Sequence, residues 1–310
     1  GNELLLSGDT CHDQQQLSNI VAALTCDISP GMPIIAHSGN QISQRLGEGT
    51  IVVPIENDGK VIGILIAAEK QGTDTTVSSV DVKMLSATAS QLGIFLENAL
   101  LYEDLNATFL GTLEALTASI DAKDKYTCGH SQRVALLTAQ LADAAGLPEA
   151  QVGRFRIAGL VHDIGKIGVP ESVLLKKGEL TDNEYESVQQ HPEIGARILR
   201  DIPQMSDILG GVLHHHERFD GGGYPHGLAK EEIPLVARII AIADTFDAMS
   251  SSRTYRKAMT RTEVLNEMKR STPGQFDPVL ASLFFALDFS KWEELMIEHQ
   301  TGQTTERLAA

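Results

Sequence analysis

The residues best suited to chemistry are a histidine and an aspartate side by side, His162 and Asp163. An imidazole nitrogen and a carboxylate are both good ligands for a divalent metal, although one such pair is common by chance. Six of the ten histidines fall between positions 130 and 216. The other residues of this character are His130, His191, His214, His215, His216, Glu217, Asp220, Asp244 and Asp247. Histidines interleaved with acidic residues in this way predict a metal site.

These residues must be positioned by helices, because the second half of the chain is helical in its pattern. We expect helices over 131–145, 149–164, 181–191, 192–199 and from Pro234 through Asp247. Thr181 and Glu184 form a capping box, and Pro192 ends one helix and opens the next. His162 and Asp163 lie at a helix end, and a helical bundle can bring such positions together at one interior cleft.

The first third of the chain predicts a β-hairpin. Two β-branched runs, 50–55 and 61–66, flank the turn residues Asp58 and Gly59. We also expect a short strand over 3–6 and a helix over 14–24. The fragment Cys11-His12 is interpreted as part of a plain loop.

A long helix is expected from Asp81 to about Lys123. It carries an apolar stripe with a spacing of three or four residues, at Leu105, Phe109, Leu113, Leu116 and Ile120. A stripe of this kind must be buried. We favour a parallel two-helix coil between two protomers, and packing against the chain's own domains is the alternative.

Composition restricts the class of protein. The formal net charge is −16, which argues against a general binder of nucleic-acid polymers or membrane surfaces. No apolar run reaches the roughly 20 residues needed to span a bilayer. The three cysteines (Cys11, Cys26 and Cys128) form no disulfide framework, so we expect a cytoplasmic location.

The motifs of the helical half resemble those of the HD-GYP phosphodiesterases, a branch of the HD-domain metal phosphohydrolases. The resemblance covers about 110–285, and its ordered motifs are 162–166, 191–195, 215–217, 220–225, 233–238, Asp244, 253–257 and 275–278. The hairpin followed by a helix resembles the C-terminal half of a GAF sensory domain. We therefore expect an α+β protein with an N-terminally incomplete α/β GAF-like domain over 1–98, a connecting coiled-coil helix over 99–123 and an all-α HD-type catalytic bundle over 124–310.

The resemblance implies hydrolysis of cyclic di-GMP to pGpG, and in some members onward to GMP, by attack of a metal-bridging hydroxide. It implies two divalent ions, iron or manganese, with Asp163 as the bridge. One ion would take His130, His162, Asp163 and Asp244, and the other Asp163, His191, His215 and His216. Some members hold a third ion through a glutamate four residues before the first histidine. Tyr126 stands there, so we expect two ions at this centre.

Further roles are expected around the metals. Lys166, Arg253, Arg256 and Lys257 are candidates for phosphate contacts, and Tyr224 for contact with a guanine. Asp247 either orients a ligand histidine or Lys166, or helps to transfer protons. Two alternatives stay open beside a cyclic di-GMP phosphodiesterase. One is hydrolysis of a related nucleotide such as cyclic GMP-AMP, and the other is a cyclic di-GMP sensor that acts through protein contacts.

Overall fold

The computed structural model describes residues 28–36, 44, 46, 48–68, 70, 76–121, 129–176, 178–251 and 258–309, with side chains as far as 299. The expected strand over 3–6, the helix over 14–24 and the Cys11-His12 fragment lie outside these residues. The chain divides into two compact units, Gly1–Thr108 and Phe109–Ala310. The three-part domain division expected from the sequence stays a prediction.

The N-terminal unit contains the expected hairpin. Strand β2 (Ile51–Asn57) pairs antiparallel with β3 (Lys60–Ala67), and β1 (Ile34–Ile35) pairs with the other edge of β2. The turn residues Asp58 and Gly59 both have positive φ, 45° and 72°. This backbone suits a two-residue hairpin loop, since its twist matches that of the flanking strands. The hairpin prediction is confirmed.

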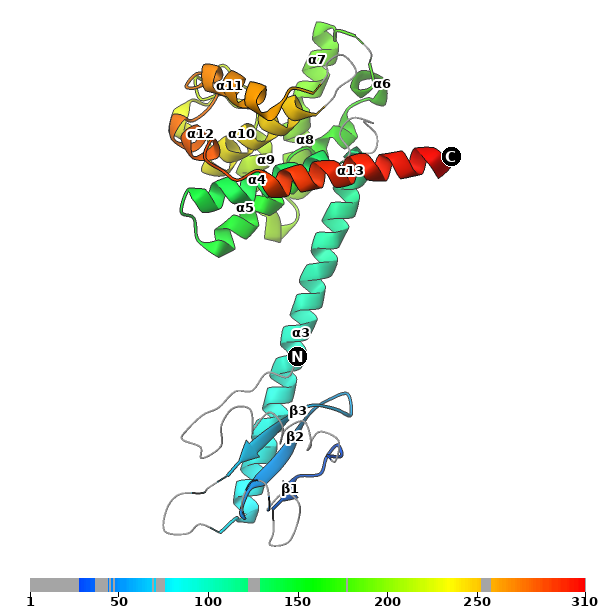
Figure 1. Ribbon diagram of the computed structural model, residues 1–310, viewed down its shortest axis with the longest axis vertical. Coiled ribbons are helices and arrows are strands. Elements are labelled where there is room, and N and C mark those ends of the chain that lie inside the picture. Colours follow the sequence, from blue (N-terminus) through cyan, green and yellow to red (C-terminus); the bar gives the residue numbers. More distant parts are fainter. Residues whose placement is uncertain are drawn as a thin grey trace. The chain divides into compact units, whose positions relative to one another are not determined.

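Alternation along β2 gives the sheet two apolar faces. Ile51, Val53 and Ile55 pack with Ala89 of helix α3 (Ser79–Asp121), whereas Val52 packs on the other face with Ile28. Successive side chains of a strand point to opposite faces, so one strand supplies both clusters. Figure 1 shows the strands lying against the first part of α3.

Helix α3 runs from Ser79 to Asp121 over 43 residues, which confirms the long helix. The expected end at Lys123 lies outside the described residues. Leu113 and Ile120 of the expected stripe are buried in the core of the C-terminal unit, and Phe109 packs against the same core. Leu105 and Leu116 are exposed at 66% and 38%. Part of the stripe therefore follows the intramolecular alternative.

The C-terminal unit is a helical bundle (Figure 1). Its elements are α4 (His130–Ala144), α5 (Glu149–Val161), η1 (Ile164–Gly168), α6 (Glu171–Leu174), α7 (Asp182–Gln189), α8 (His191–Leu199), η2 (Pro203–Met205), α9 (Leu209–His214), η3 (Lys230–Glu232), α10 (Leu235–Ser250), α11 (Arg261–Ser271), α12 (Pro278–Phe284) and α13 (Ser290–Ala309).

Most helix boundaries in this unit follow the sequence signals. The capping box of Thr181 and Glu184 opens α7, and Pro192 sits in the first turn of α8. The expected helix over 149–164 is too long, because α5 ends at Val161 and residues 164–168 form the separate 3₁₀ helix η1. The break has a physical reason at Gly165, where the chain passes against the backbone of His191.

The core of this unit is apolar and aromatic. Phe246 of α10 contacts the rings of Phe284, Phe289 and Trp292 at centroid distances of 4.8–5.3 Å. Side chains of α4, including the fully buried Leu137, extend the same core. The core therefore holds α4 and α10 together, and these two helices carry two of the candidate ligands, His130 and Asp244. No helix in the described parts of the chain is both long and apolar enough to cross a bilayer.

Candidate metal centre

The seven candidate ligands sit at helix ends or on the inner face of α10. His130 is the first residue of α4, His191 is the first residue of α8, and Asp244 lies within α10. The turn that ends α5 carries His162 and Asp163, and the turn after α9 carries His215 and His216. A side chain at a helix end can point along the bundle. Residues that are distant in sequence can therefore meet at one place.

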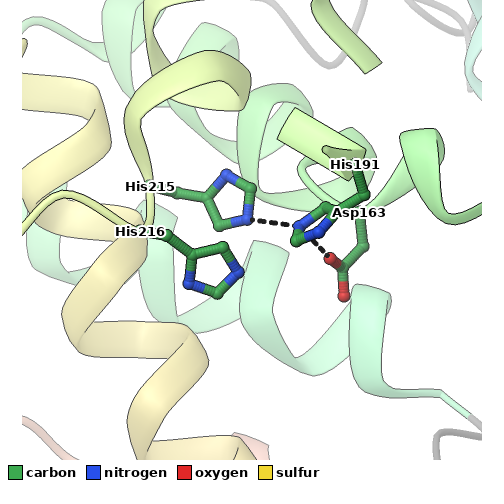
Figure 2. A group of neighbouring side chains, drawn as sticks. All are labelled: Asp163, His191, His215 and His216. Carbon is green, nitrogen blue, oxygen red and sulfur yellow. Dashed lines mark hydrogen bonds and ion pairs between the residues drawn. The ribbon is translucent and has the colours of Figure 1, made fainter. Parts of the chain in front are cut away.

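Four of the candidates form one cluster. Asp163, His191, His215 and His216 each offer a ligand atom within 4.8 Å of the others. Figure 2 shows these four side chains gathered together. Nε2 of His191 lies 3.2 Å from Oδ1 of Asp163 and 3.2 Å from Nε2 of His215. This set is the one expected from the sequence for one of the two ions, and the structure brings it together.

The other three candidates form a neighbouring cluster, which consists of His130, His162 and Asp244. Nε2 of His130 lies 3.3 Å from Oδ1 of Asp244. The second oxygen of Asp163 faces this cluster, at 3.3 Å from His162 Nε2 and 3.7 Å from His130 Nε2. Asp163 thus presents one carboxylate oxygen to each cluster, which is the arrangement needed of a bridging ligand.

Backbone carbonyls fix the orientation of three of these imidazoles. Nδ1 of His162, His191 and His215 each donates to the carbonyl oxygen three residues earlier, at 2.7, 2.7 and 2.8 Å. A carbonyl can only accept, so Nδ1 carries a proton, and in the neutral form of each ring the lone pair lies on Nε2. Outer hydrogen bonds of this kind are typical of metal-binding histidines.

The resulting donor set fits a divalent cation. Nε2 of His191 and Nε2 of His215 face each other only 3.2 Å apart, and both are lone-pair donors when each ring carries its single proton on Nδ1. Nε2 of His162 is buried and has no hydrogen-bond partner among the described residues. Lone pairs gathered in a buried space are costly unless a positive charge satisfies them. The two His/Asp clusters therefore fit divalent metal binding.

The pKa values in the centre distinguish histidines that are neutral from carboxylates that attract positive charge. Burial lowers the pKa of His215 well below its usual value and that of His216 to about 4, so both rings are neutral at pH 7. Burial also acts to lower the pKa of His130. The carboxylates of Asp244 and Asp247 outweigh it and raise the pKa of His130 to about 10. The carboxylates of the centre therefore attract positive charge.

Asp247 connects the residues of a buried polar network next to the centre. Its side chain is 0% exposed. His130 Nδ1 donates to its Oδ2 at 2.8 Å, Arg133 donates to both of its oxygens at 2.7 and 2.9 Å, and Trp292 Nε1 donates to Oδ1 at 2.8 Å. Of the roles expected for Asp247, this geometry supports the orientation of a ligand histidine.

Arg133 and Trp292 were not anticipated from the sequence. Arg133 lies three residues after His130, on the same face of α4, and that spacing was the available signal. Trp292 comes from α13, and nothing in its local sequence points to Asp247. Asp121 was also missed. It accepts from the backbone N–H and the hydroxyl of Ser131, and so ties the end of α3 to the start of α4.

Lys166 lies beside the bridging candidate. Its Nζ donates to Oδ2 of Asp163 at 2.5 Å, and its side chain is 27% exposed. Burial acts to raise the pKa of Asp163, but the Lys166 ammonium and His162 outweigh it and keep that pKa well below its usual value. Lys166 therefore stands between the centre and solvent.

Tyr224 stacks on His216, with ring centroids 4.9 Å apart and planes at 25°. Burial raises the pKa of the Tyr224 hydroxyl, which stays protonated at neutral pH. The expected phosphate contacts Arg253, Arg256 and Lys257 lie outside the described residues, as does Tyr126. The structure therefore places Lys166 and Tyr224 at the centre and leaves the roles of the other four as predictions.

Gly165 sets how closely η1 approaches α8. A Cβ at this position would lie 1.9 Å from the carbonyl oxygen of His191 and 2.5 Å from the backbone nitrogen of Gly195. Backbone atoms cannot yield as a flexible side chain can. We expect Gly165→Ala to lower the free energy of unfolding by about 1–3 kcal/mol and to reduce metal content, because it pushes Asp163 away from His191.

Urea denaturation and metal counting measure both effects. Gly153→Ala is the matched control, since a Cβ there meets nothing within 4 Å. Gly153 lies inside α5, so this change is expected to stabilise the protein by about 0.5–1 kcal/mol. Equal stability of the two variants would contradict the close approach.

Comparison with known proteins agrees with the site geometry. The family model described as HD domain matches residues 114–280. A cyclic di-GMP phosphodiesterase of Pseudomonas aeruginosa is 43% identical over 187 residues, 59% of this chain and 45% of that protein. A cyclic di-GMP phosphodiesterase of Thermotoga maritima is 39% identical over 189 residues, 60% of this chain and 50% of that protein.

A 3′3′-cGAMP-specific phosphodiesterase of Vibrio cholerae is 33% identical over 229 residues, 73% of this chain and 43% of that protein. The chain thus spans about half the length of the curated relatives it matches. The family match covers more than half of this chain and includes all seven candidate ligands. With two His/Asp clusters joined at Asp163 inside a helical bundle, the chain belongs to the HD domain family.

Proposed function

We propose that this protein is a metal-dependent phosphodiesterase that hydrolyses cyclic di-GMP. The observation that carries the proposal is the pair of His/Asp clusters that share Asp163. Phosphodiester hydrolysis needs charge neutralisation on the phosphoryl oxygens and activation of water, and paired cations supply both when bound. The cyclic di-GMP phosphodiesterases among the relatives support this substrate.

The ligand assignment follows the two clusters. One ion is assigned to His130, His162, Asp163 and Asp244, and the other to Asp163, His191, His215 and His216. Mixed nitrogen and oxygen donors suit first-row ions such as iron or manganese. We propose two ions at this centre, in a cytoplasmic enzyme, as expected from the sequence.

The chain's own residues have separate tasks in the proposed reaction. Asp247 holds a proton on His130 Nδ1, so that Nε2 of that ring faces the centre. Lys166 brings a mobile positive charge to the edge of the centre, where it can leave Asp163 for a substrate phosphate. Tyr224 keeps its hydroxyl proton, so the hydroxyl can donate a hydrogen bond to the edge of a base. Arg253, Arg256 and Lys257 are proposed for the second phosphate.

Lys166→Met tests the phosphate role. We expect kcat/KM to fall about 10–100-fold with metal content unchanged, because a charge-assisted hydrogen bond to the substrate is lost. Steady-state kinetics and metal counting on the same preparation check this. Lys176→Met is the control, since it removes a half-buried Lys–carboxylate contact of the same 2.5 Å length, to Glu184, which belongs to neither cluster. Unchanged kcat/KM in Lys166→Met would contradict the proposed contact between Lys166 and the substrate phosphate.

Cyclic GMP-AMP is the second candidate substrate, because three Vibrio cholerae relatives are named as specific for it. A kinetic panel with both nucleotides separates the two. We expect kcat/KM to be at least about tenfold higher for cyclic di-GMP, a difference of about 1.4 kcal/mol in transition-state binding. A preference for cyclic GMP-AMP would change the proposed substrate but not the proposed metal centre.

We further propose that the N-terminal unit is GAF-like and regulatory, and that the protein forms a homodimer along α3. The support is a row of exposed apolar side chains on one face of that helix: Ile94, Phe95, Leu101, Tyr102 and Leu105. Helices with such a stripe pair to cover it. A ligand that changes this pairing would bias the catalytic unit.

Charged substitutions in this row of apolar side chains test the dimer. Ile94→Glu with Leu101→Glu is expected to convert the dimer to a monomer in analytical ultracentrifugation, because carboxylates cannot be buried in the helix pair. Ala107→Glu, at an exposed position on the opposite face of the same helix, should leave the dimer intact. A monomeric wild-type chain at working concentration would refute the proposal.

A further inference from the structure

A third group of metal-binding side chains lies beside the proposed catalytic centre and is distinct from it. His214, Glu217 and His226 each offer one ligand atom within 4.8 Å of the others. None of the three belongs to the seven candidate ligands, and the proposed hydrolysis uses none of them. His214 and Glu217 lie three residues apart at the end of α9, and His226 follows the Gly-rich segment and Tyr224.

The contacts within the group are those of a small closed loop. Oε1 of Glu217 lies 3.7 Å from Nδ1 of His214 and accepts the backbone N–H of His226 at 2.8 Å. The rings of His214 and His226 are 5.2 Å apart between centroids. Glu217, at the start of the loop 217–226, therefore holds His226, at its end, close by.

Two buried polar atoms in the group are left without hydrogen bonds. Oε2 of Glu217 and Nδ1 of His214 have no hydrogen-bond partner among the described residues, and Glu217 as a residue is only 3% exposed. A buried carboxylate oxygen without a hydrogen bond carries an uncompensated desolvation cost. Native proteins rarely keep such atoms without a reason, and a missing ion is one of the reasons.

We propose that His214, Glu217 and His226 bind a single cation, with zinc as the best match to two imidazoles and one carboxylate. Zinc takes nitrogen ligands at about 2.0–2.1 Å and carboxylate oxygen at about 2.0–2.2 Å, with four ligands as its usual number. The 3.7 Å separation of Nδ1 and Oε1 is compatible with a shared ion. His226 is exposed, so its ring can turn to complete the set, and water takes the fourth position.

The consequence of this site is a clamp on the loop that carries Tyr224. The loop starts at Glu217 and ends at His226, and both ends would hold the same ion. Tyr224 lies inside it and stacks on His216 of the catalytic centre. The cation would therefore restrain a proposed substrate contact without touching the substrate itself.

Equilibrium dialysis of the metal-free full chain against micromolar zinc tests the proposal, with zinc counted per chain. His226→Ala and Glu217→Gln are each expected to bind one zinc fewer than the wild type. Glu217→Gln keeps an acceptor for the His226 N–H, so the loop contact survives the change. Glu231→Gln removes an exposed carboxylate of η3 and should bind as many zinc ions as the wild type.

The same comparison in an Asp163→Asn background separates this site from the catalytic one. There, too, His226→Ala is expected to lower the count by one, even if the proposed dinuclear centre no longer binds metal. Equal counts in the wild type, His226→Ala and Glu217→Gln, with circular dichroism unchanged, would overturn the proposal. Loss of two or more zinc ions from either variant would also overturn it, because these residues would then belong to the catalytic centre.

Discussion

Asp163→Asn is expected to reduce metal-dependent hydrolysis at least about a thousandfold, which corresponds to roughly 4 kcal/mol of transition-state stabilisation. The side chain presents one oxygen to His191 at 3.2 Å and the other to His162 at 3.3 Å. An amide has the same shape, but it carries no negative charge and its nitrogen cannot bind a cation. Metal content should fall together with the rate.

The control for Asp163→Asn removes a carboxylate where nothing depends on it. Asp201 has a side chain that is 84% exposed, and Asp201→Asn should keep both rate and metal content. Circular dichroism of both variants establishes that they are folded. Retention of two metal ions and of more than about a tenth of the wild-type rate by Asp163→Asn would contradict its assignment as the bridge.

Asp247→Ala is expected to lower the free energy of unfolding by about 3–5 kcal/mol. The substitution leaves the Arg133 guanidinium, which is 3% exposed, buried without its bidentate partner, and it also removes the acceptor of Trp292 Nε1. A buried charge without a partner carries its full desolvation cost. Urea denaturation of the wild type and the variant measures the difference.

A matched surface pair provides the reference for this effect. Arg154 donates to both oxygens of Asp207 at 2.9 and 2.7 Å, so the geometry is bidentate as in the buried pair. The side chain of Asp207 is 54% exposed, and Asp207→Ala is expected to cost no more than about 1 kcal/mol. Similar losses from Asp207→Ala and Asp247→Ala would show that burial of the network contributes little.

Asp247 also orients a proposed ligand, so Asp247→Asn has a second readout. The amide keeps most of the volume but is a weaker acceptor for His130 Nδ1. Loss of such an outer hydrogen bond typically weakens metal affinity 10–100-fold. Metal titration of Asp247→Asn can therefore separate the orienting role from the contribution to stability.

Local chemistry explains which parts of the fold could be predicted from the sequence. The Asp58-Gly59 turn specifies the hairpin, because few residues tolerate positive φ at both positions. Thr181 with Glu184 marks the start of α7 by a capping box that needs only neighbouring residues. The seven candidate ligands were found because their motifs are dense and ordered, and the structure gathers all seven into two clusters.

Long-range contacts explain what could not be predicted. The end of α5 at Val161 depends on the passage of Gly165 against α8, a contact between segments about 26 residues apart. The network of Asp247 draws on Arg133 and Trp292, which lie 114 and 45 residues away in sequence. The spacing of Arg133 and His130 places both on one face of α4, but no local pattern indicates that Asp247 and Trp292 join them, so the network emerged only from the three-dimensional arrangement.

The most direct test of the proposed function is an anaerobic hydrolysis assay. The metal-free full chain is loaded with Fe(II) or Mn(II), incubated with cyclic di-GMP, and the products are separated by chromatography. The account predicts pGpG or GMP with metal, and no product either without metal or in Asp163→Asn. Cyclic di-GMP that is bound but left intact with both metals would contradict the enzyme and point to a sensor.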